Sequence, residues 1–370
     1  MAKIGSFEFS LRELGGSLGD LGTLLPLAVG YITVCGVDPA GMLVFMGLAN
    51  IVTGVVYRLP MPIEPMKVLA VMAIAQAWSP DLVFVSGLAM GITWILLGFS
   101  GAITWIGSRT PQAVIRGIQL SLGLLLAIQG FRMVGGAWVL AAVSIMIILV
   151  LRDNRYAPAS LVLVAGGILL MAFKGDLSQI QSISFSLPPF RTLRLELLWP
   201  AIRDGGFSQV PLTAANAVIA TSALINRYWP DRFVSVRQLS LNMGFMNLLG
   251  PFMGGIPLCH GAGGLAGQYY YGARTGGANV MEGILEVLLG LFLAGHIASI
   301  FRSFPMAIVG AMMIMVGVEM AKFAASVRTS RDWTVVAVTV GFSVYLNMAA
   351  GFVAGLAAAW AFENLGKNRK

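Results

Sequence analysis

The sequence predicts an all-α polytopic membrane protein whose fourteen transmembrane segments form two inverted repeats of seven. Its 370 residues are 57% hydrophobic and only 11% charged, which is far too apolar for a soluble globular protein. One pattern occurs twice, because residues 46–70 and 243–267 align without a gap and share Met-Gly, Asn and Pro at matching positions. An odd number of segments per repeat inverts the second half, and the distribution of basic residues fits that inversion.

A segment needs roughly 20 apolar residues to cross the hydrocarbon layer, and fewer where protein surrounds it. The first half contains seven such segments, at 18–36, 39–57, 62–77, 81–107, 111–131, 136–151 and 157–173. The second half contains seven more, at 206–225, 236–255, 261–273, 278–301, 304–322, 332–346 and 347–363. The third segment of each half is short and opens on Pro or Gly residues, so we expect the third and tenth segments to be broken.

These segments divide the chain into four parts. We expect residues 1–173 to form the first repeat, 174–205 an extracytoplasmic connection, 206–363 the second repeat and 364–370 a short cytoplasmic tail. Within the connection, apolar residues at 183, 185 and 187 alternate with serines, which favours a short strand or an interfacial segment. The stretch before the first segment mixes apolar and charged residues, and an interfacial segment or a plain cytosolic tail would fit it equally well.

The positive-inside rule predicts the orientation. With the N-terminus inside, seventeen of the 24 Lys and Arg residues fall on the cytoplasmic side and Lys67 lies within a segment. The six on the outer side are Arg132, Lys174, Arg191, Arg194, Arg203 and Arg302. Both termini are therefore expected in the cytoplasm of a cell whose plasma or inner membrane holds the chain, although merging the last two segments would move the C-terminus outside. Topology explains the net charge of +8, so no nucleic-acid partner is expected.

The third segment opens on the sequence PMPIEPMK, residues 60–67. Proline lacks an N–H group and restricts the residue before it, so regular helix is expected to begin at Pro65 or Met66. Such a start leaves backbone N–H groups without intrahelical partners at membrane depth, at the positive end of the helix dipole. This arrangement favours an anion.

The tenth segment opens on LCHGAGGLAG, residues 258–267. Its glycines let a ligand approach the backbone closely, and the helix is expected to begin between Ala262 and Leu265. Two helix N-termini from opposite repeats would form one site for a small anion near the bilayer midplane, the pattern of a secondary transporter. The alternative is that these residues only kink closely packed helices, and we favour the anion site because the two segments match.

Charged and titratable residues near these starts are candidates for function. Lys67 either supplies a fixed positive charge for an anion or forms a salt bridge with Glu64 or Asp20. Asp20, Glu64 and His260 are candidates for proton coupling, because titratable groups inside a membrane commonly form proton relays. Asp20 could instead cap the first helix, which is the simpler role.

Neutral and acidic side chains elsewhere add to this set. Hydrogen bonds to an anion are offered by Thr23, Thr33, Gln209 and Thr213. Glu282 and Glu286, one helical turn apart, could line a path or pair with Arg274, although solvated or structural roles are favoured.

No metal, cofactor or enzyme activity is expected. Cys259 and His260 are adjacent and no further ligands cluster with them, which argues against a metal site. Cys35 and Cys259 both lie inside hydrophobic stretches, so a disulfide is not indicated. No nucleophile, base and orienting partner occur together near the expected midplane.

Three blocks of this sequence resemble the molybdate transporter family, a branch of the sulfate permease-like superfamily. They are GDLGTLLPLAV (19–29), PMPIEPMK (60–67) and PLCHGAGGLAGQYYYGARTG (257–276), with GGFSQVPLT (205–213) in support. The resemblance implies a seven-plus-seven inverted repeat shared with nucleobase and sulfate permeases, often homodimeric. In that fold a core domain, here 18–107 plus 206–301, moves against a gate domain, here 111–173 plus 304–363. The family usually has Gln where this chain has Glu64, so an extra carboxylate either favours proton coupling or neutralises Lys67.

With this resemblance, the residues predict secondary active transport of a tetrahedral oxyanion, molybdate first, by an elevator-type alternating-access mechanism that could be proton-coupled. The alternatives are a sulfate transporter, an anion channel and a nucleobase permease on the same fold. The last would need a carboxylate in the eighth segment, where Gln209 stands without an acid. The expected substrate-binding residues are Thr23, Pro65, Met66, Lys67, Gln209, His260, Gly261, Ala262, Gly263 and Gly264.

Overall fold

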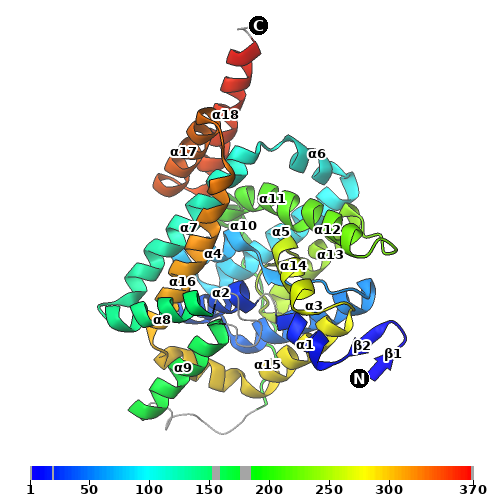
Figure 1. Cartoon of the computed structure of the whole chain (residues 1–370), viewed down its shortest axis with the longest axis vertical. Coiled ribbons are helices and arrows are strands. Elements are labelled where there is room, and N and C mark those ends of the chain that lie inside the picture. Colours follow the sequence, from blue (N-terminus) through cyan, green and yellow to red (C-terminus); the bar gives the residue numbers. More distant parts are fainter. Residues whose placement is uncertain (1, 19–20, 152–158, 176–184, 368–370) are drawn as a thin grey trace.

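The computed structural model describes residues 2–18, 21–151, 159–175 and 185–367, and most of them lie in helices (Figure 1). Each of the fourteen predicted segments contains at least one helix. In the first half these are α2 (Leu21–Thr33), α3 (Pro39–Tyr57), α4 (Lys67–Ala75), α5 (Pro80–Ser100), α7 (Gln112–Val134), α8 (Trp138–Val150) and α9 (Ala159–Lys174). In the second half they are α11 (Phe207–Thr213) with α12 (Ala220–Tyr228), α13 (Val236–Leu249), α14 (Ala262–Tyr271), α15 (Gly277–Ser303), α16 (Met306–Ala321), α17 (Ser330–Tyr345) and α18 (Met348–Lys367).

Two short antiparallel strand pairs correct the all-α prediction. β1 (Ala2–Ile4) pairs with β2 (Phe7–Phe9) and leads into the short helix α1 (Leu11–Ser17). β3 (Glu64–Pro65) pairs with β4 (Leu258–Cys259), and so joins the two halves of the chain. In the connection between the halves, a short strand is one of two alternatives for residues 183–187. That alternative is wrong for residues 185–187, which have no regular structure, and residue 183 lies outside the described residues.

The fourth and eighth segments are less regular than predicted. The fourth is divided into α5 and α6 (Ala102–Arg109) at Gly101, whose positive φ of 71° ends the first helix. The eighth segment is preceded by η3 (Leu195–Leu197) and α10 (Leu198–Ala201). Its helix α11 lies between two π-helical turns, η4 (Ile202–Gly206) and η5 (Ala214–Ile219). Pro211 lies within α11 and lacks the N–H group of a regular helix, a common cause of such irregularity.

Within the described residues, five helices are long and apolar enough to cross a membrane. They are α3, α5, α7, the Gly277–Ile297 part of α15, and α16 with its continuation η7 (Lys322–Ser326). A sixth is present if Leu195–Thr213 and Ala217–Tyr228, bent by 41°, count as one span. The chain is therefore a helical, multi-pass membrane protein.

Helices of the first half pack on helices of the second. α3 packs on α15 and α5 on α13, whereas α7 packs on α16 and α17, and α17 on α18 (Figure 1). Glycines permit the closest of these crossings, because a methyl group added to either member of a facing pair would collide with the other's carbonyl oxygen. The pairs are Gly47 with Gly283 and Gly54 with Gly276 between α3 and α15, and Gly123 with Gly317 and Gly130 with Gly310 between α7 and α16.

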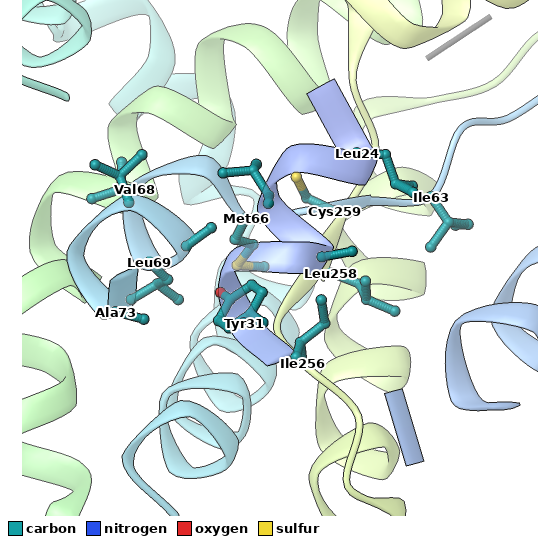
Figure 2. Packing of buried hydrophobic residues seen from close by; sticks show 14 of the residues in the cluster. Leu24, Tyr31, Ile63, Met66, Val68, Leu69, Ala73, Ile256, Leu258 and Cys259 are labelled. Carbon is teal, nitrogen blue, oxygen red and sulfur yellow. The ribbon is translucent and has the colours of Figure 1, made fainter. Parts of the chain in front are cut away.

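The centre of the molecule is apolar and surrounds the β3–β4 pair. Side chains of α2, including Leu24 and Tyr31, lie close to Met66, Leu258 and Cys259 around this pair (Figure 2). All five residues are buried. The starts of α4 and α14 are thereby fixed inside the protein rather than at its surface.

Candidate functional site

The β3–β4 pair brings the two predicted helix starts together. Glu64 stands opposite Cys259 and Pro65 opposite Leu258, and the Met66 N–H donates to the carbonyl of Pro257 at 2.9 Å. α4 then begins at Lys67, immediately after the predicted Pro65 or Met66, and α14 begins at Ala262, within the predicted range. Residues almost 200 positions apart in the sequence therefore form one structural unit.

Both helices begin beside one cavity of about 490 Å³, which is within the usual range for small-molecule sites. Its walls come from α2, α4, α11 and α14 on one side and from α7 and α16 on the other. Most of the wall is apolar. The polar and glycine residues that line it are Glu64, Lys67, Gln119, Gln209, Thr213, His260, Gly261, Gly263, Gly264 and Glu319.

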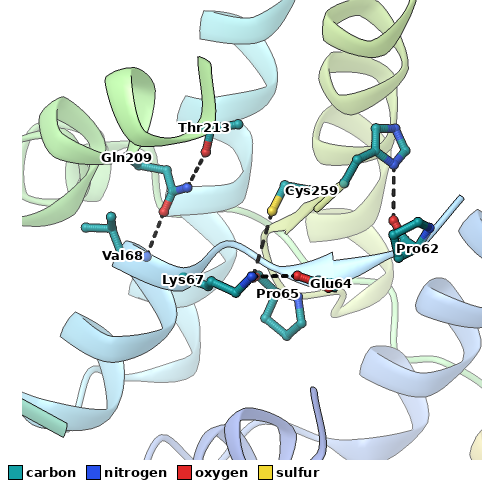
Figure 3. A network of polar contacts seen from close by, with 9 residues as sticks. Pro62, Glu64, Pro65, Lys67, Val68, Gln209, Thr213 and Cys259 are labelled. Carbon is teal, nitrogen blue, oxygen red and sulfur yellow. Dashed lines mark hydrogen bonds and ion pairs between the residues drawn. The ribbon is translucent and has the colours of Figure 1, made fainter. Parts of the chain in front are cut away.

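Gln209 of α11 caps the N-terminus of α4. Its Oε1 accepts hydrogen bonds from the Val68 N–H at 2.9 Å and the Leu69 N–H at 3.2 Å. Figure 3 shows the bond from Val68 and the bond that Gln209 Nε2 donates to Thr213 Oγ1. An amide oxygen thus satisfies donors that a helix start leaves open. In this conformation the backbone donors of Met66 and Val68 are used within the protein.

The N-terminus of α14 is different, because Gly261 at its N-cap has no side chain to offer. The carboxylate of Glu64 lies against this helix start. A methyl group added to Gly264 would fall on Glu64 Oε1, and one added to Gly261 would lie 2.6 Å from Oε2. The first turn of α14 therefore faces a negative charge of the protein itself, which suits the positive end of a helix dipole.

Glu64 and Lys67 form a salt bridge, which is one of the alternatives for Lys67. Lys67 Nζ lies 2.8 Å from Glu64 Oε2, and the Glu64 side chain is only 2% exposed while that of Lys67 is 31% exposed (Figure 3). The other oxygen, Oε1, is buried and accepts no hydrogen bond from any described residue. Of the remaining candidates near this pair, Asp20 and the side chain of Thr23 lie outside the described part of the structure.

His260 lines the cavity and is held from both sides. Its Nδ1 lies 3.2 Å from the carbonyl of Pro62 and its Nε2 lies 2.9 Å from Asn242 Oδ1. Among the described residues, no group of three or more His, Cys, Asp or Glu side chains could hold a metal ion.

Several polar residues lie elsewhere than expected. Thr33 donates to a backbone carbonyl of its own helix. Glu282 and Glu286 are buried, so a solvated role is wrong, and Glu286 Oε2 accepts from Asn50 at 2.8 Å in the contact between α3 and α15. Arg274 instead stacks on the ring of Tyr269 at 3.6 Å.

Sequence reasoning did not identify the polar residues that α7 and α16 bring to the cavity. Gln119 of α7 is buried and accepts a hydrogen bond from Arg116 at 2.9 Å, and Glu319 of α16 pairs with Lys322. A buried amide within an apolar helix is the signal that could have indicated Gln119. Glu319 gave no such signal, because an acid at a helix end is usually a solvated residue.

Known proteins resemble this chain over most of its length. A family model described as "Molybdate transporter of MFS superfamily" matches residues 12–126 and 201–320. Molybdate transporter 1 of Arabidopsis thaliana is 31% identical and covers 94% of this chain and 87% of its own. Molybdate transporter 1 of Chlamydomonas reinhardtii is 28% identical, over 94% of this chain and 91% of its own. These names confirm the expectation of a transport protein rather than an enzyme.

Solved structures share the fold. The transmembrane domain of a cyanobacterium bicarbonate transporter, BicA, superposes with a TM-score of 0.68 at 17% identity, covering 94% of this chain and 97% of that one. The murine anion transporter Slc26a9 in its inward-facing state gives a TM-score of 0.73 at 14% identity, covering 99% of this chain and 70% of that one. The fold is thus that of membrane transporters, and the family match together with the motifs around Glu64 and His260 establishes that this chain belongs to the molybdate transporter family.

Proposed function

We propose that this protein is a secondary active transporter of a tetrahedral oxyanion, with molybdate as the first candidate and sulfate as the second. The observation that carries the proposal is the β3–β4 pair, from which two helices begin beside one cavity with Lys67 in its wall. Helix N-termini supply several oriented N–H donors at once, which suits a compact anion with oxygen atoms on all sides. The relatives named as molybdate transporters support molybdate as the first candidate.

The packing of the helices supports two inverted repeats of seven spans. The second predicted segment (α3) packs on the eleventh (α15), and the fourth (α5) packs on the ninth (α13). This exchange of partners is expected when a twofold axis relates the halves, because the second and ninth segments are then equivalent, as are the fourth and eleventh. We assign fourteen spans on this basis. Both termini are placed on the cytoplasmic side of the plasma or inner membrane.

The position of the cavity supports an elevator mechanism. It lies between helices of the expected core domain, 18–107 plus 206–301, and helices α7 and α16 of the expected gate domain, 111–173 plus 304–363. Movement of the core past the gate would carry the site from one side of the membrane to the other. A stationary gate requires a firm support, and a homodimer formed through the gate domains would supply one.

In this proposal the anion is bound chiefly at the start of α14. The donors are the backbone N–H groups of Gly261 to Gly264, with Lys67 adding positive charge and Thr23 adding a hydrogen bond. His260, which is held by Pro62 and Asn242, orients the segment before this helix. Gln209, with Pro65 and Met66, holds the start of α4 in place. Proton coupling is assigned to the titratable residues Asp20, Glu64 and His260.

Purified protein in proteoliposomes tests this function. With an inward proton gradient, uptake of labelled molybdate should exceed equilibrium, and molybdate should compete better than sulfate. Downhill flux without accumulation would instead identify an anion channel. Tighter binding of sulfate than of molybdate would reverse the order of substrates, and exclusive uptake of a nucleobase would refute the oxyanion site.

A further inference from the structure

We propose that Glu64 is an internal anion that occupies the oxyanion position at the start of α14, and that it must take up a proton before an external oxyanion can replace it. The proposal rests on the oxyanion function above and specifies how that site is regulated. It makes binding of one oxyanion and uptake of one proton a single coupled event.

The geometry places the carboxylate where the substrate would bind. The strand register sets Glu64 opposite Cys259, two residues before the Gly261 N-cap, and its Oε1 lies at the Gly264 backbone. α14 is ten residues long, and its first turn receives no side-chain cap. The buried Oε1, which has no hydrogen-bond partner among the described residues, thus lies beside the first turn of α14, where the positive end of the helix dipole stabilises a negative charge.

Electrostatics then requires the carboxylate to be neutralised. Molybdate and sulfate carry two negative charges, and Lys67 already balances the one charge of Glu64 across 2.8 Å. Placing a dianion beside an ionised carboxylate in a buried site is strongly unfavourable. A proton taken from solution converts the carboxylate into a neutral acid, which frees Lys67 to pair with the oxyanion and adds an O–H donor.

Other titratable groups face the same cavity, and the proton could be taken up by one of them instead of Glu64. They are Lys67 at the start of α4, Cys259 and His260 before α14, and Glu319 of α16. His260 is already held through both ring nitrogens, and Glu319 is exposed by 44% and pairs with Lys322. Glu64 is the carboxylate in direct contact with the first turn of α14.

Calorimetric titration of the purified full chain with micromolar molybdate tests the proposal. Titrations between pH 6.5 and 8.5, in buffers of different ionisation enthalpy, report the protons taken up per anion. The wild type should take up close to one proton, and its affinity for molybdate should fall by about tenfold for each unit by which the pH rises across this range. Glu64→Gln should take up none and should bind at least about tenfold more tightly than the wild type at pH 8.5.

Glu363→Gln is the matched control, because it removes one exposed carboxylate from α18 and should leave affinity and proton uptake unchanged. Proton uptake that persists in Glu64→Gln overturns the proposal and assigns the proton to another group. Tighter binding by Glu64→Gln with no proton uptake by the wild type overturns it as well. Infrared difference spectra of the wild type should show a protonated carboxyl C=O band when molybdate binds, and its absence refutes the proposal even if Glu64→Gln does not fold.

The same data separate this inference from the proposed function. If the wild type binds molybdate with equal affinity at both ends of the pH range, only the role of Glu64 is wrong. If neither the wild type nor Glu64→Gln binds molybdate or sulfate at any pH, the oxyanion site itself is wrong.

Discussion

The starts of α4 and α14 are related in sequence but differ in how their N–H groups are used. At α4 the amide oxygen of Gln209 accepts from Val68 and Leu69, so this helix start is closed by a neutral group. At α14 the start is glycine-rich, has no side-chain cap and faces the charge of Glu64. A repeated motif can therefore give two helix starts that differ in capping and in the charge they face.

The difference follows from the residues at equivalent places. The first copy carries proline, glutamate and lysine, which fix the backbone and bring charge, whereas the second copy carries glycines, which leave the backbone open. Each copy thus lacks what the other supplies. Three substitutions test this division and a fourth tests the loop that follows α14, in order of decreasing expected effect.

Lys67→Ala should have the largest effect, because it removes the positive charge of the site and leaves the buried Glu64 carboxylate without its counter-ion. Losing one partner of such a pair is worth several kcal/mol, so molybdate uptake should fall by at least about 100-fold. Initial rates in proteoliposomes measure this. Arg194→Ala, which removes an exposed basic residue, is the control, and unchanged uptake by Lys67→Ala would remove Lys67 from the site.

Gly264→Ala should weaken molybdate binding by roughly tenfold, since overpacking by one methyl group costs about 1–3 kcal/mol. The added methyl falls on the Glu64 carboxylate and on the position proposed for the anion. Gly263→Ala is the matched comparison, because its methyl meets open space and should cause a much smaller loss. Equal losses in the two variants would contradict the assignment of Gly264 to the anion position.

Gln209→Leu should act on stability first and on transport second. It leaves the Val68 and Leu69 N–H groups buried without an acceptor, which costs about 1–3 kcal/mol. Thermal unfolding in detergent should show a lower Tm, whereas Gln209→Glu keeps an acceptor and should lose less. A Gln209→Leu protein as stable as the wild type would show that α4 does not depend on this cap.

Glu13→Gln should have the smallest effect. Burial raises the pKa of Glu13 above 4.5, although the backbone N–H groups of Arg274 and Thr275, in the loop after α14, act in the opposite direction. A carboxyl whose pKa is higher in the folded state stabilises the fold below its unfolded pKa and loses that contribution as the pH rises through the folded pKa.

The wild type should therefore lose some stability between pH 4.5 and neutrality that Glu13→Gln retains. We expect a loss of less than about 1 kcal/mol, because the hydrogen bonds from Arg274 and Thr275 offset part of the effect of burial. Unfolding curves at the two ends of that range measure the difference. If the free energy of unfolding changed equally with pH in the wild type and in Glu13→Gln, the raised pKa of Glu13 would be contradicted.

Much of this arrangement could be predicted from local patterns. Hydrophobic length indicated fourteen segments, each of which contains a helix, and the prolines and glycines indicated the starts of α4 and α14 to within about two residues. These features depend on backbone chemistry within a few residues, so a single sequence contains them. The Glu64–Lys67 pair is equally local, because the two residues are three apart.

The rest depends on contacts between distant segments. Gln209 reaches Val68 across 141 residues, and no local pattern indicates which helix start an amide will cap. Glu64 lies on Gly264 because the β3–β4 pair sets the register, and two-residue strands between prolines are too short to be recognised. Gln119 and Glu319 reach the cavity only through the packing of α7 and α16.

The facing glycines have a consequence for how the protein is made. Gly47 and Gly54 of α3 meet their partners only when Gly276 and Gly283 have been synthesised, more than 200 residues later. At about 5–20 residues per second, α3 waits roughly 10–50 seconds for α15. During this interval its glycine face lies against lipid or the insertion machinery. The first half of the chain therefore enters the membrane before these contacts can form, and a ribosome that stops between the halves leaves a product that lacks them.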